Sequence, residues 1–313
     1  MAYEAAPFFA AAAKGPDGGA AHWAQAEDGK RLRVAGWKAG VRGTVVFFNG
    51  LNEFIEKYGP TAVDMAKAGY SSATLDWRSQ GMSDRLHDDP LLGYIERFAD
   101  FQKDAKAFYA YLDEMGFPKP WHLVGHSMGG MIALRAVQGA HPFTSVTFSA
   151  PMWGINFRTT PKPVAHSIAA LFAAFGLDTR YVFGDGPQSY VQRAPFEDNR
   201  LTHNAESYAW MKEIYAMPEV QRGGPTFKWL SEALKEIRAQ RHARRPDIPV
   251  LLVLGDGDQV VQNDAALKRA EEWDLDNVLI LSPSRHEPFM ETPDVRETLI
   301  RGLLKHFEAA EAA

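Results

Sequence analysis

A serine between two glycines is the first feature of this sequence that indicates chemistry. The stretch "GHSMG" (125–129) fits the pattern G-x-S-x-G. An apolar run ends at Val124 and a stretch with helical potential begins near Met128, so Ser127 lies in a predicted strand-to-helix turn. Small residues two positions before and after the serine allow the sharp turn that presents a nucleophilic hydroxyl. The alternative is a glycine-rich turn without chemistry.

An acid and a base follow the serine along the chain. The stretch "LGDGDQVV" comes directly after a predicted strand over 250–254, and two aspartates in it compete for the role of acid. We favour Asp258, which lies further into the loop, over Asp256, which would otherwise be a solvated turn residue. His286 lies in the loop after the last predicted strand, where a neutral imidazole would take the serine proton. The order Ser127, Asp258, His286 is that of the α/β-hydrolases.

An oxyanion hole requires two backbone N–H groups directed at the developing charge. The first would come from Met128, the residue after the nucleophile. The second would come from the loop "FFNGLNEFIEKYGP" that follows the strand predicted over 44–48, and we choose Leu51. Gly50 allows the backbone to turn close to the site. The alternative is that Asn49 and Gly50 form only a turn.

The composition excludes several other classes of protein and site. A net charge of −5 argues against a nucleic-acid partner, which usually requires a basic surplus. The absence of cysteine excludes disulfides, thiolate metal sites and a cysteine nucleophile. The histidines other than His286 lack paired ligand spacing, so we expect no metal. Among them, His126 is expected to point away from Ser127.

The sequence also bears on location. The apolar run at 168–177 is about half of the roughly 20 residues that a spanning helix needs. The apolar N-terminal stretch carries the acidic Glu4 and no preceding basic residue, which is the wrong polarity for a signal peptide. We therefore expect a cytoplasmic protein, whose contact with the inner membrane face would be peripheral.

Alternating strands and helices must position these residues. Apolar runs without polar alternation are typical of parallel strands buried on both faces, and they predict strands over 44–48, 71–75, 121–124, 145–149, 248–255 and 277–282. Helical patterns lie between them, over 60–68, 95–115, 128–138 and 293–309. The pattern predicts an α/β protein with a mostly parallel central sheet flanked by helices.

The strand-helix rhythm stops after Pro151 and resumes near 248. Residues 1–151 and 236–313 are therefore predicted to form two parts of one core, with a helical cap over 152–235. One face of its first helical pattern is apolar and either lines an acyl pocket or packs the cap onto the core: Ile168, Leu171, Phe172 and Phe175. Phe172 and Phe175 are the substrate-binding candidates. Basic cap residues either meet a phosphate or form a solvated surface: Arg158, Lys162, Arg180, Arg193 and Arg200.

These motifs together resemble the lysophospholipase and monoacylglycerol-lipase branch of the α/β-hydrolase superfamily, which is grouped with serine aminopeptidases of the S33 type. The likeness is carried by "FFNGLNEFIEKYG", by "LDWRSQGMSDR", which is similar to a D-x-R-G-x-G-x-S segment, and by "GHSMGG", "LGDGDQVV" and "SRHEPFME". Within the cap, "LTHN" and "GGPTFKWLSEAL" are similar to bacterial lysophospholipase L2. Asn49 stands where many members have histidine, a change that leaves a backbone donor unaffected.

The resemblance implies acyl transfer from a small-molecule lipid or other carboxylic ester, most readily a lysophospholipid. Ser127 would attack the ester, His286 would act as base, and no cofactor or protein partner is implied. Alternatives are a monoacylglycerol lipase or general carboxylesterase, and a proline iminopeptidase-like peptidase in which Glu53 or Glu56 meets a free amine. A hydrolase fold used only for binding is the alternative from another class.

Overall fold

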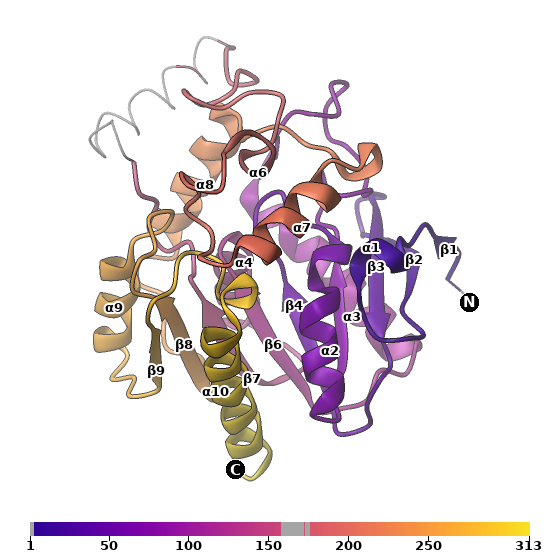
Figure 1. Cartoon of the computed structure of the whole chain (residues 1–313), viewed down its shortest axis with the longest axis vertical. Helices are drawn as coiled ribbons and strands as arrows, with labels where there is room; N and C mark the ends of the chain where they lie inside the picture. Colours follow the sequence, from indigo (N-terminus) through magenta and orange to yellow (C-terminus); the bar gives the residue numbers. More distant parts are fainter. Residues whose placement is uncertain (1–2, 158–171, 173–175) are drawn as a thin grey trace.

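A single mixed sheet runs through the protein (Figure 1). The computed structural model describes residues 3–157, 172 and 176–313. The strands occur in the order β1-β2-β3-β5-β4-β6-β7-β8-β9. Pairing is antiparallel from β1 to β5 through β2 and β3, and parallel from β5 to β9. Their bounds are β1 Ala5–Ala6, β2 Ala20–Gln25, β3 Arg31–Trp37, β4 Thr44–Phe48, β5 Ser71–Leu75, β6 Trp121–His126, β7 Phe143–Ser149, β8 Val250–Gly255 and β9 Val278–Leu281.

The parallel strands are apolar on both faces because each face is covered by helices. Along β4, Val46 and Phe48 join one hydrophobic core, whereas Val45 and Phe47 join a second core on the opposite face. The predicted mostly parallel sheet flanked by helices is therefore confirmed. The predicted strands at 121–124 and 145–149 extend further, to the bounds of β6 and β7.

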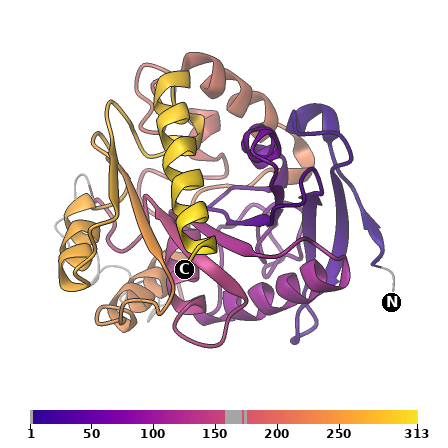
Figure 2. The same cartoon turned by 90° about the horizontal axis from the view of Figure 1, so that it is seen from below.

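Helices cover the two faces of the sheet, as Figure 2 shows from below. Helices α2 (Gly59–Lys67) and α10 (Pro293–Glu311) contribute to one core. Helices α3 (Phe101–Glu114), α4 (Met128–Ala136) and α9 (Asn263–Glu272) contribute to the other. Short elements complete the chain: α1 Ala10–Ala13 and the 3-10 turns η1 Ile55–Tyr58, η2 Phe98–Asp100 and η4 Pro288–Met290.

The helix predicted over 95–115 was placed too early. It begins at Phe101, after the short turn η2. Arg97 has an extended backbone, with φ −142° and ψ 131°, and the Asp100 carboxylate binds the side chains of Arg97 and Lys103 at the helix start. An extended residue cannot continue a helix, so the apolar periodicity at Ile95 reflects burial in an irregular segment.

Between β7 and β8, the described residues contribute no strand to the sheet. They form α6 (Tyr190–Arg193), α7 (Ala205–Tyr215), the turn η3 (Pro218–Val220) and α8 (Phe227–Ala239). Figure 1 places these elements together at one end of the sheet. Helix α8 runs through residue 235, so the cap boundary at that position stays a prediction. No helix in the described part of the chain has the length and apolar character needed to cross a membrane.

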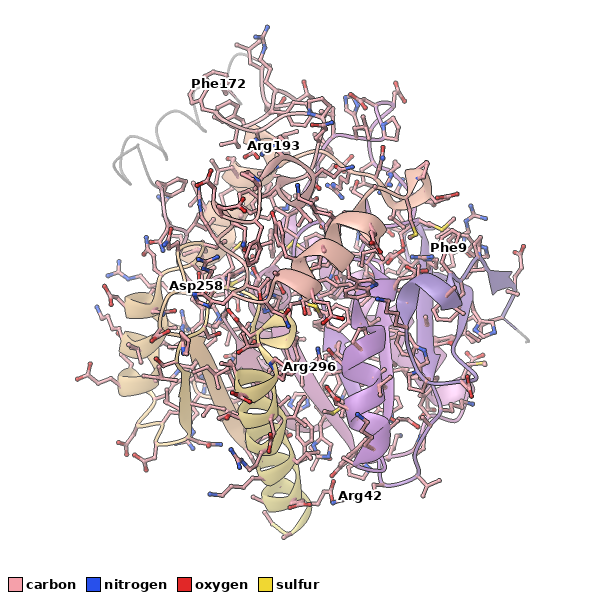
Figure 3. All side chains as sticks on the ribbon, in the orientation of Figure 1. Phe9, Arg42, Phe172, Arg193, Asp258 and Arg296 are labelled. Atoms are coloured by element: carbon pink, nitrogen blue, oxygen red, sulfur yellow. The ribbon has the colours of Figure 1, made fainter. Side chains whose placement is uncertain are left out.

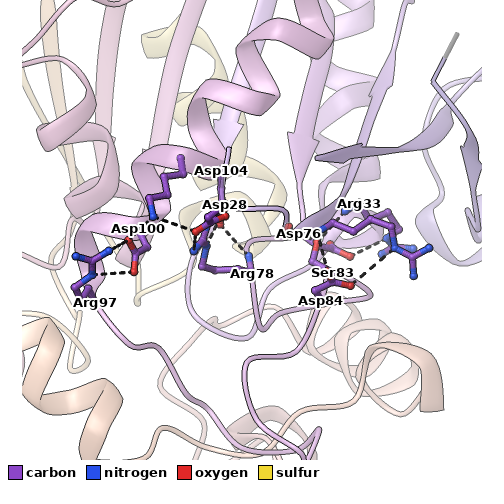
Figure 4. A network of polar contacts seen from close by, with 11 residues as sticks. Asp28, Arg33, Asp76, Arg78, Ser83, Asp84, Arg97, Asp100 and Asp104 are labelled. Carbon is purple, nitrogen blue, oxygen red and sulfur yellow. Dashed lines mark hydrogen bonds and ion pairs between the residues drawn. The ribbon is translucent and has the colours of Figure 1, made fainter. Parts of the chain in front are cut away.

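A buried cluster of charged side chains connects strand β3 to the loops that follow β4 and β5 (Figure 4). The Arg33 guanidinium on β3 donates to Asp76 at 2.7 Å and to Glu56 at 2.8 Å, and all three side chains are fully buried. Asp76 also accepts the backbone N–H groups of Ile55 and Met82. One carboxylate therefore joins β3, the segment after β4 and the loop after β5.

Arg33→Met should destabilise the protein strongly. Removal of the guanidinium leaves Glu56 and Asp76 as unpaired buried carboxylates, which typically costs about 3–5 kcal/mol. The measurement is the urea midpoint of unfolding. Arg31→Met is the control, because the Arg31 side chain is 53% exposed and lies 3.9 Å from Asp84. Equal shifts for the two variants would contradict this account.

Candidate active site

Ser127 occupies a strained turn between β6 and α4. Its φ of 53° and ψ of −116° are unusual for a residue with a side chain. A Cβ on Gly129 would overlap the carbonyl group of Phe48, and a Cβ on Gly125 would lie 2.8 Å from that of Ala133. Both positions therefore require glycine, which explains the glycine spacing around the serine.

Three side chains from separate loops form a continuous hydrogen-bonded series. The His286 Nε2 atom lies 2.9 Å from Ser127 Oγ, and its Nδ1 atom lies 2.7 Å from Asp258 Oδ2. The other Asp258 oxygen accepts the N–H groups of Val260 and Val261 at 2.7 and 3.1 Å. Figure 3 labels Asp258 in the loop after β8. The arrangement has the geometry of a nucleophile, a base and an orienting acid.

Asp256, the competing aspartate, contacts a different partner. Its carboxylate accepts the N–H of Ser284 at 3.0 Å, two residues before His286. Hydrogen bonds from Ser282 and Ser284 lower its pKa. Asp256 is exposed, as expected of a solvated turn residue, and it also binds the backbone of the histidine loop, a contact that neither alternative predicted.

The electrostatics of His286 and Asp258 favour a protonated imidazolium next to an ionised carboxylate. Burial by itself would lower the pKa of His286, but the adjacent Asp258 carboxylate raises it above the usual 6.5. Burial by itself would raise the pKa of Asp258, but His286 and the two backbone N–H groups hold it below its usual value. The site therefore stabilises the protonated histidine that forms when the serine loses its proton.

Two backbone N–H groups beside Ser127 donate to no other group among the described residues: those of Leu51 and Met128. Gly50 allows the Leu51 N–H to approach Ser127, since a Cβ on Gly50 would lie only 3.3 Å from the Cβ of Ser127. Gln80 fixes the loop by accepting the N–H of Asn52 at 2.7 Å and donating to the carbonyl of Gly50 at 3.1 Å. Both predicted donors thus belong to residues close to Ser127 and have no partner among the described residues, and their role in an oxyanion hole stays a prediction.

Sequence reasoning missed a buried lysine that joins two loops of the site. The Lys57 ammonium binds the carboxylates of Glu53 and, at 2.7 Å, Glu287. Glu53 also accepts the N–H of Gly50 and the hydroxyl of Tyr58. Despite burial, Lys57 holds the pKa of Glu287 well below its usual range. The four-residue spacing of Glu53 and Lys57 was a signal for their pairing, but no signal near Lys57 indicated that Glu287 joins them.

His126 lies closer to the site than the sequence analysis expected. It is buried, its ring centroid lies 5.1 Å from that of His286, and its Nε2 atom lies 3.3 Å from Glu287. Ligand atoms of Glu53, His126 and Glu287 approach within 4.8 Å of one another, a spacing that suits a metal. Lys57 already binds both of these carboxylates, so its ammonium supplies the cation of this cluster.

The predicted substrate-binding residues are placed only in part. Phe172 packs on Phe227 and Phe183, with ring centroids 4.1 and 5.9 Å away, and Figure 3 shows it far from Asp258. Phe175 lies outside the described residues, as do four other predicted cap residues: Arg158, Lys162, Ile168 and Leu171.

Of the three described basic cap candidates, two have identified neighbours. Arg193 pairs with Asp185, and Arg200 lies over the ring of Tyr190. Arg180 is exposed. Arg180 and Arg193 are typical of a solvated surface, whereas Arg200 is half-buried and its Nε atom has no hydrogen-bond partner among the described residues.

Comparison with known families gives a match over most of the chain. The family model described as serine aminopeptidase, S33, matches residues 39–293. A probable lysophospholipase L2 of Haemophilus influenzae is 28% identical over 279 residues, covering 86% of this chain and 85% of the relative. Lysophospholipase L2 of Escherichia coli is 30% identical over 278 residues, covering 84% of this chain and 79% of the relative.

Solved structures share the fold at lower identity. A soluble variant of monoglyceride lipase from Saccharomyces cerevisiae has a TM-score of 0.71 at 20% identity, covering 92% of this chain and 94% of its own. A monoacylglycerol lipase from Paleococcus ferrophilus has a TM-score of 0.67 at 21% identity, covering 89% and 99%. At such identities, the likeness bears on the fold alone.

Asp258→Asn should lower the pKa of His286, because the carboxylate that raises it is removed. Nuclear magnetic resonance titration of ¹⁵N-labelled histidine measures the change. We expect His286 to titrate above pH 6.5 in the unaltered protein and lower in the variant. Asp256→Asn is the matched control and should leave this pKa nearly unchanged, since Asp256 binds the backbone of Ser284. A larger effect from Asp256 would reassign the acid.

Proposed function

The chain belongs to the serine aminopeptidase S33 family, and from this membership we propose that it is a carboxylic ester hydrolase acting on lysophospholipids. The observation that carries the proposal is the hydrogen-bonded series from Ser127 through His286 to Asp258. Next to it are the backbone N–H groups of Leu51 and Met128, which donate to no other group among the described residues. A hydrolase fold used only for binding would not need this arrangement.

We propose the following reaction. Ser127 Oγ attacks the ester carbonyl while its proton passes to His286 Nε2, and Leu51 and Met128 donate to the oxyanion. The imidazolium, stabilised by Asp258, then protonates the leaving alcohol, and an acyl-enzyme remains. Water attacks the acyl-enzyme with His286 again as base, which releases the fatty acid and restores the serine.

The lysophospholipid is favoured over other substrates by the relatives. The two curated relatives described above are named as lysophospholipases L2 and match most of this chain. The monoglyceride lipases share only the fold at their low identity, and a neutral glyceride is kept as the second candidate substrate. A peptidase is disfavoured because Glu53 and Glu56, the carboxylates proposed for a free amine, are already bound by Lys57 and Arg33.

We also propose that the protein acts at the inner membrane face by peripheral contact from the cytoplasm. Lysophospholipids reside in the bilayer, so an enzyme that cleaves them must meet its surface. Sedimentation with phospholipid vesicles at low salt tests this contact, and a protein that stays entirely in the supernatant would contradict it.

Substitutions of the three proposed catalytic residues should reduce ester hydrolysis by orders of magnitude. Ser127→Ala should lower kcat for a short-chain nitrophenyl ester by about 10⁴-fold or more. Asp258→Asn should lower it by about 10⁴-fold, because it leaves His286 without its orienting carboxylate. Asp256→Asn, the matched control, should act far more weakly. Equal rates for Ser127→Ala and the unaltered enzyme would disprove the mechanism.

A competition among four substrates should identify the preferred class. The panel consists of lysophosphatidylcholine, a monoacylglycerol with the same acyl chain, a nitrophenyl ester and a prolyl amide. We expect the highest kcat/KM for lysophosphatidylcholine, since the proposed substrate carries a phosphate. A preference for the amide would reject the lipid reaction, and a preference for the monoacylglycerol would reject the phosphate.

A further inference from the structure

Four arginines carry buried guanidinium nitrogens without a hydrogen-bond partner among the described residues. Arg200 and Arg269 lie over aromatic rings, and the other two are Arg85 and Arg222. Arg222, between η3 and α8, is only 4% exposed, and its Nε and Nη1 atoms have no hydrogen-bond partner among the described residues. Arg85, in the loop after β5, donates from Nη2 to the carbonyl of Gly81 at 2.7 Å, while its Nη1 atom is likewise buried without a partner.

No carboxylate compensates the charge of Arg222. None pairs with it among the described residues, and the segments left out of the description contain no aspartate or glutamate. Burial and the like charge of Arg85 hold the pKa of Arg222 well below its usual value, but a guanidinium remains protonated at neutral pH. Asp76, the acid facing Arg85, is already bound by Arg33. Such a buried cation is costly unless an anion joins it.

Further unpartnered polar atoms lie in neighbouring segments. The hydroxyl of Tyr181 and the Oδ1 atom of Asn52 are buried without partners among the described residues. Tyr181 lies close to Gly223, the residue after Arg222, since a Cβ on Gly223 would be 2.9 Å from the Tyr181 ring. Arg85, Tyr181 and Arg222, from three separate segments, thus each carry a donor without a partner among the described residues, and Asn52 carries an acceptor without one.

The pair lies beside the oxyanion loop. The Asn52 side chain donates to the carbonyl of Gly223 at 2.9 Å, so the residue after Leu51 contacts the residue after Arg222. Segment 222–226 is also fixed by hydrogen bonds from Gly223 to Leu91 and from Thr226 to Gly93. The segment that carries Arg222 therefore lies against the oxyanion loop.

A cavity of about 410 Å³ opens beside Arg85, and neither Arg222 nor Tyr181 lines it. Arg85 lines it, as does Gln221, the residue before Arg222. Two acidic residues also line it: Asp84, which accepts the N–H of Arg31, and Glu219, which is exposed. Asp89 is a further acidic neighbour on the side of Tyr181. These carboxylates disfavour a multiply charged free anion and favour a singly charged diester whose far end is cationic or neutral.

We propose that Arg85 and Arg222, with the Tyr181 hydroxyl, bind the phosphate of the substrate headgroup, an inference that rests on the lysophospholipase function proposed above. Arginine suits this role because its planar donors match phosphate oxygens in pairs. In a lysophospholipid, the ester and the phosphate are attached to the same three-carbon glycerol. A phosphate site must therefore lie close to the oxyanion loop, where this pair is found.

The first test compares substrates that differ in the phosphate. Arg222→Met should lower kcat/KM for lysophosphatidylcholine at least about ten-fold and leave that for a monoacylglycerol of the same acyl chain within about two-fold. Arg193→Met is the control, because Arg193 is already paired with Asp185. Equal losses on both substrates, or no loss on either, would overturn the proposal. Unaltered enzyme that hydrolyses no ester would instead disprove the function proposed above.

The second test measures binding without catalysis. Glycerophosphocholine should raise the Tm of the unaltered protein by a few degrees near saturation and leave that of Arg222→Met unchanged. Glycerol is the control for the neutral part of the headgroup. A rise with inorganic phosphate but not with glycerophosphocholine would indicate a site for a free anion and overturn the headgroup assignment, as would no rise with either.

The unliganded variant provides a third readout. Arg222→Met should unfold at a higher temperature than the unaltered protein, because it removes a buried charge that nothing compensates. A structural arginine would give the opposite result. A lower Tm for Arg222→Met would therefore overturn the assignment to a ligand, even if activity also fell.

Discussion

The close packing of the turn at Ser127 is the constraint from which the rest of the site follows. The serine is held at positive φ, and its own backbone exchanges hydrogen bonds with Ser149 and Met152 at the end of β7. Helix α4 approaches β4 so closely that only glycine fits at position 129, against the carbonyl of Phe48. The chain leaving β4 must therefore pass beside the serine hydroxyl. One steric constraint thus positions both the nucleophile and the loop that carries Leu51.

A buried cation extends this arrangement to the histidine. Lys57 binds Glu53, which holds the N–H of Gly50 in the oxyanion loop, and it also binds Glu287, which follows His286. A displacement of either loop would separate a charge pair inside the protein, and that separation is costly. The same two carboxylates add to the effect of Asp258 in raising the pKa of His286. Positioning and electrostatics of the base therefore share one cluster.

The sequence predicted the sheet, and it named the residues of the hydrogen-bonded series, because both leave local signals. Apolar runs mark buried strands, and each proposed residue follows the end of a strand. Contacts between distant segments leave no such signal: nothing near Asp256 indicates that it binds the N–H of Ser284, and nothing near Lys57 indicates Glu287. The start of α3 at Phe101 depended likewise on side-chain contacts at Asp100, which periodicity does not record.

The two groups of buried cations differ in a way that separates structure from binding. Lys57 is compensated by carboxylates on both sides, so its cluster is complete within the chain. Arg222 is buried, feels the like charge of Arg85, and has no acidic partner among the described residues. Burial costs both cations their hydration, but only the first regains that energy on folding. A free energy that folding leaves unrecovered at Arg222 is available to an anion that binds there, and this difference is the physical basis of the headgroup site proposed above.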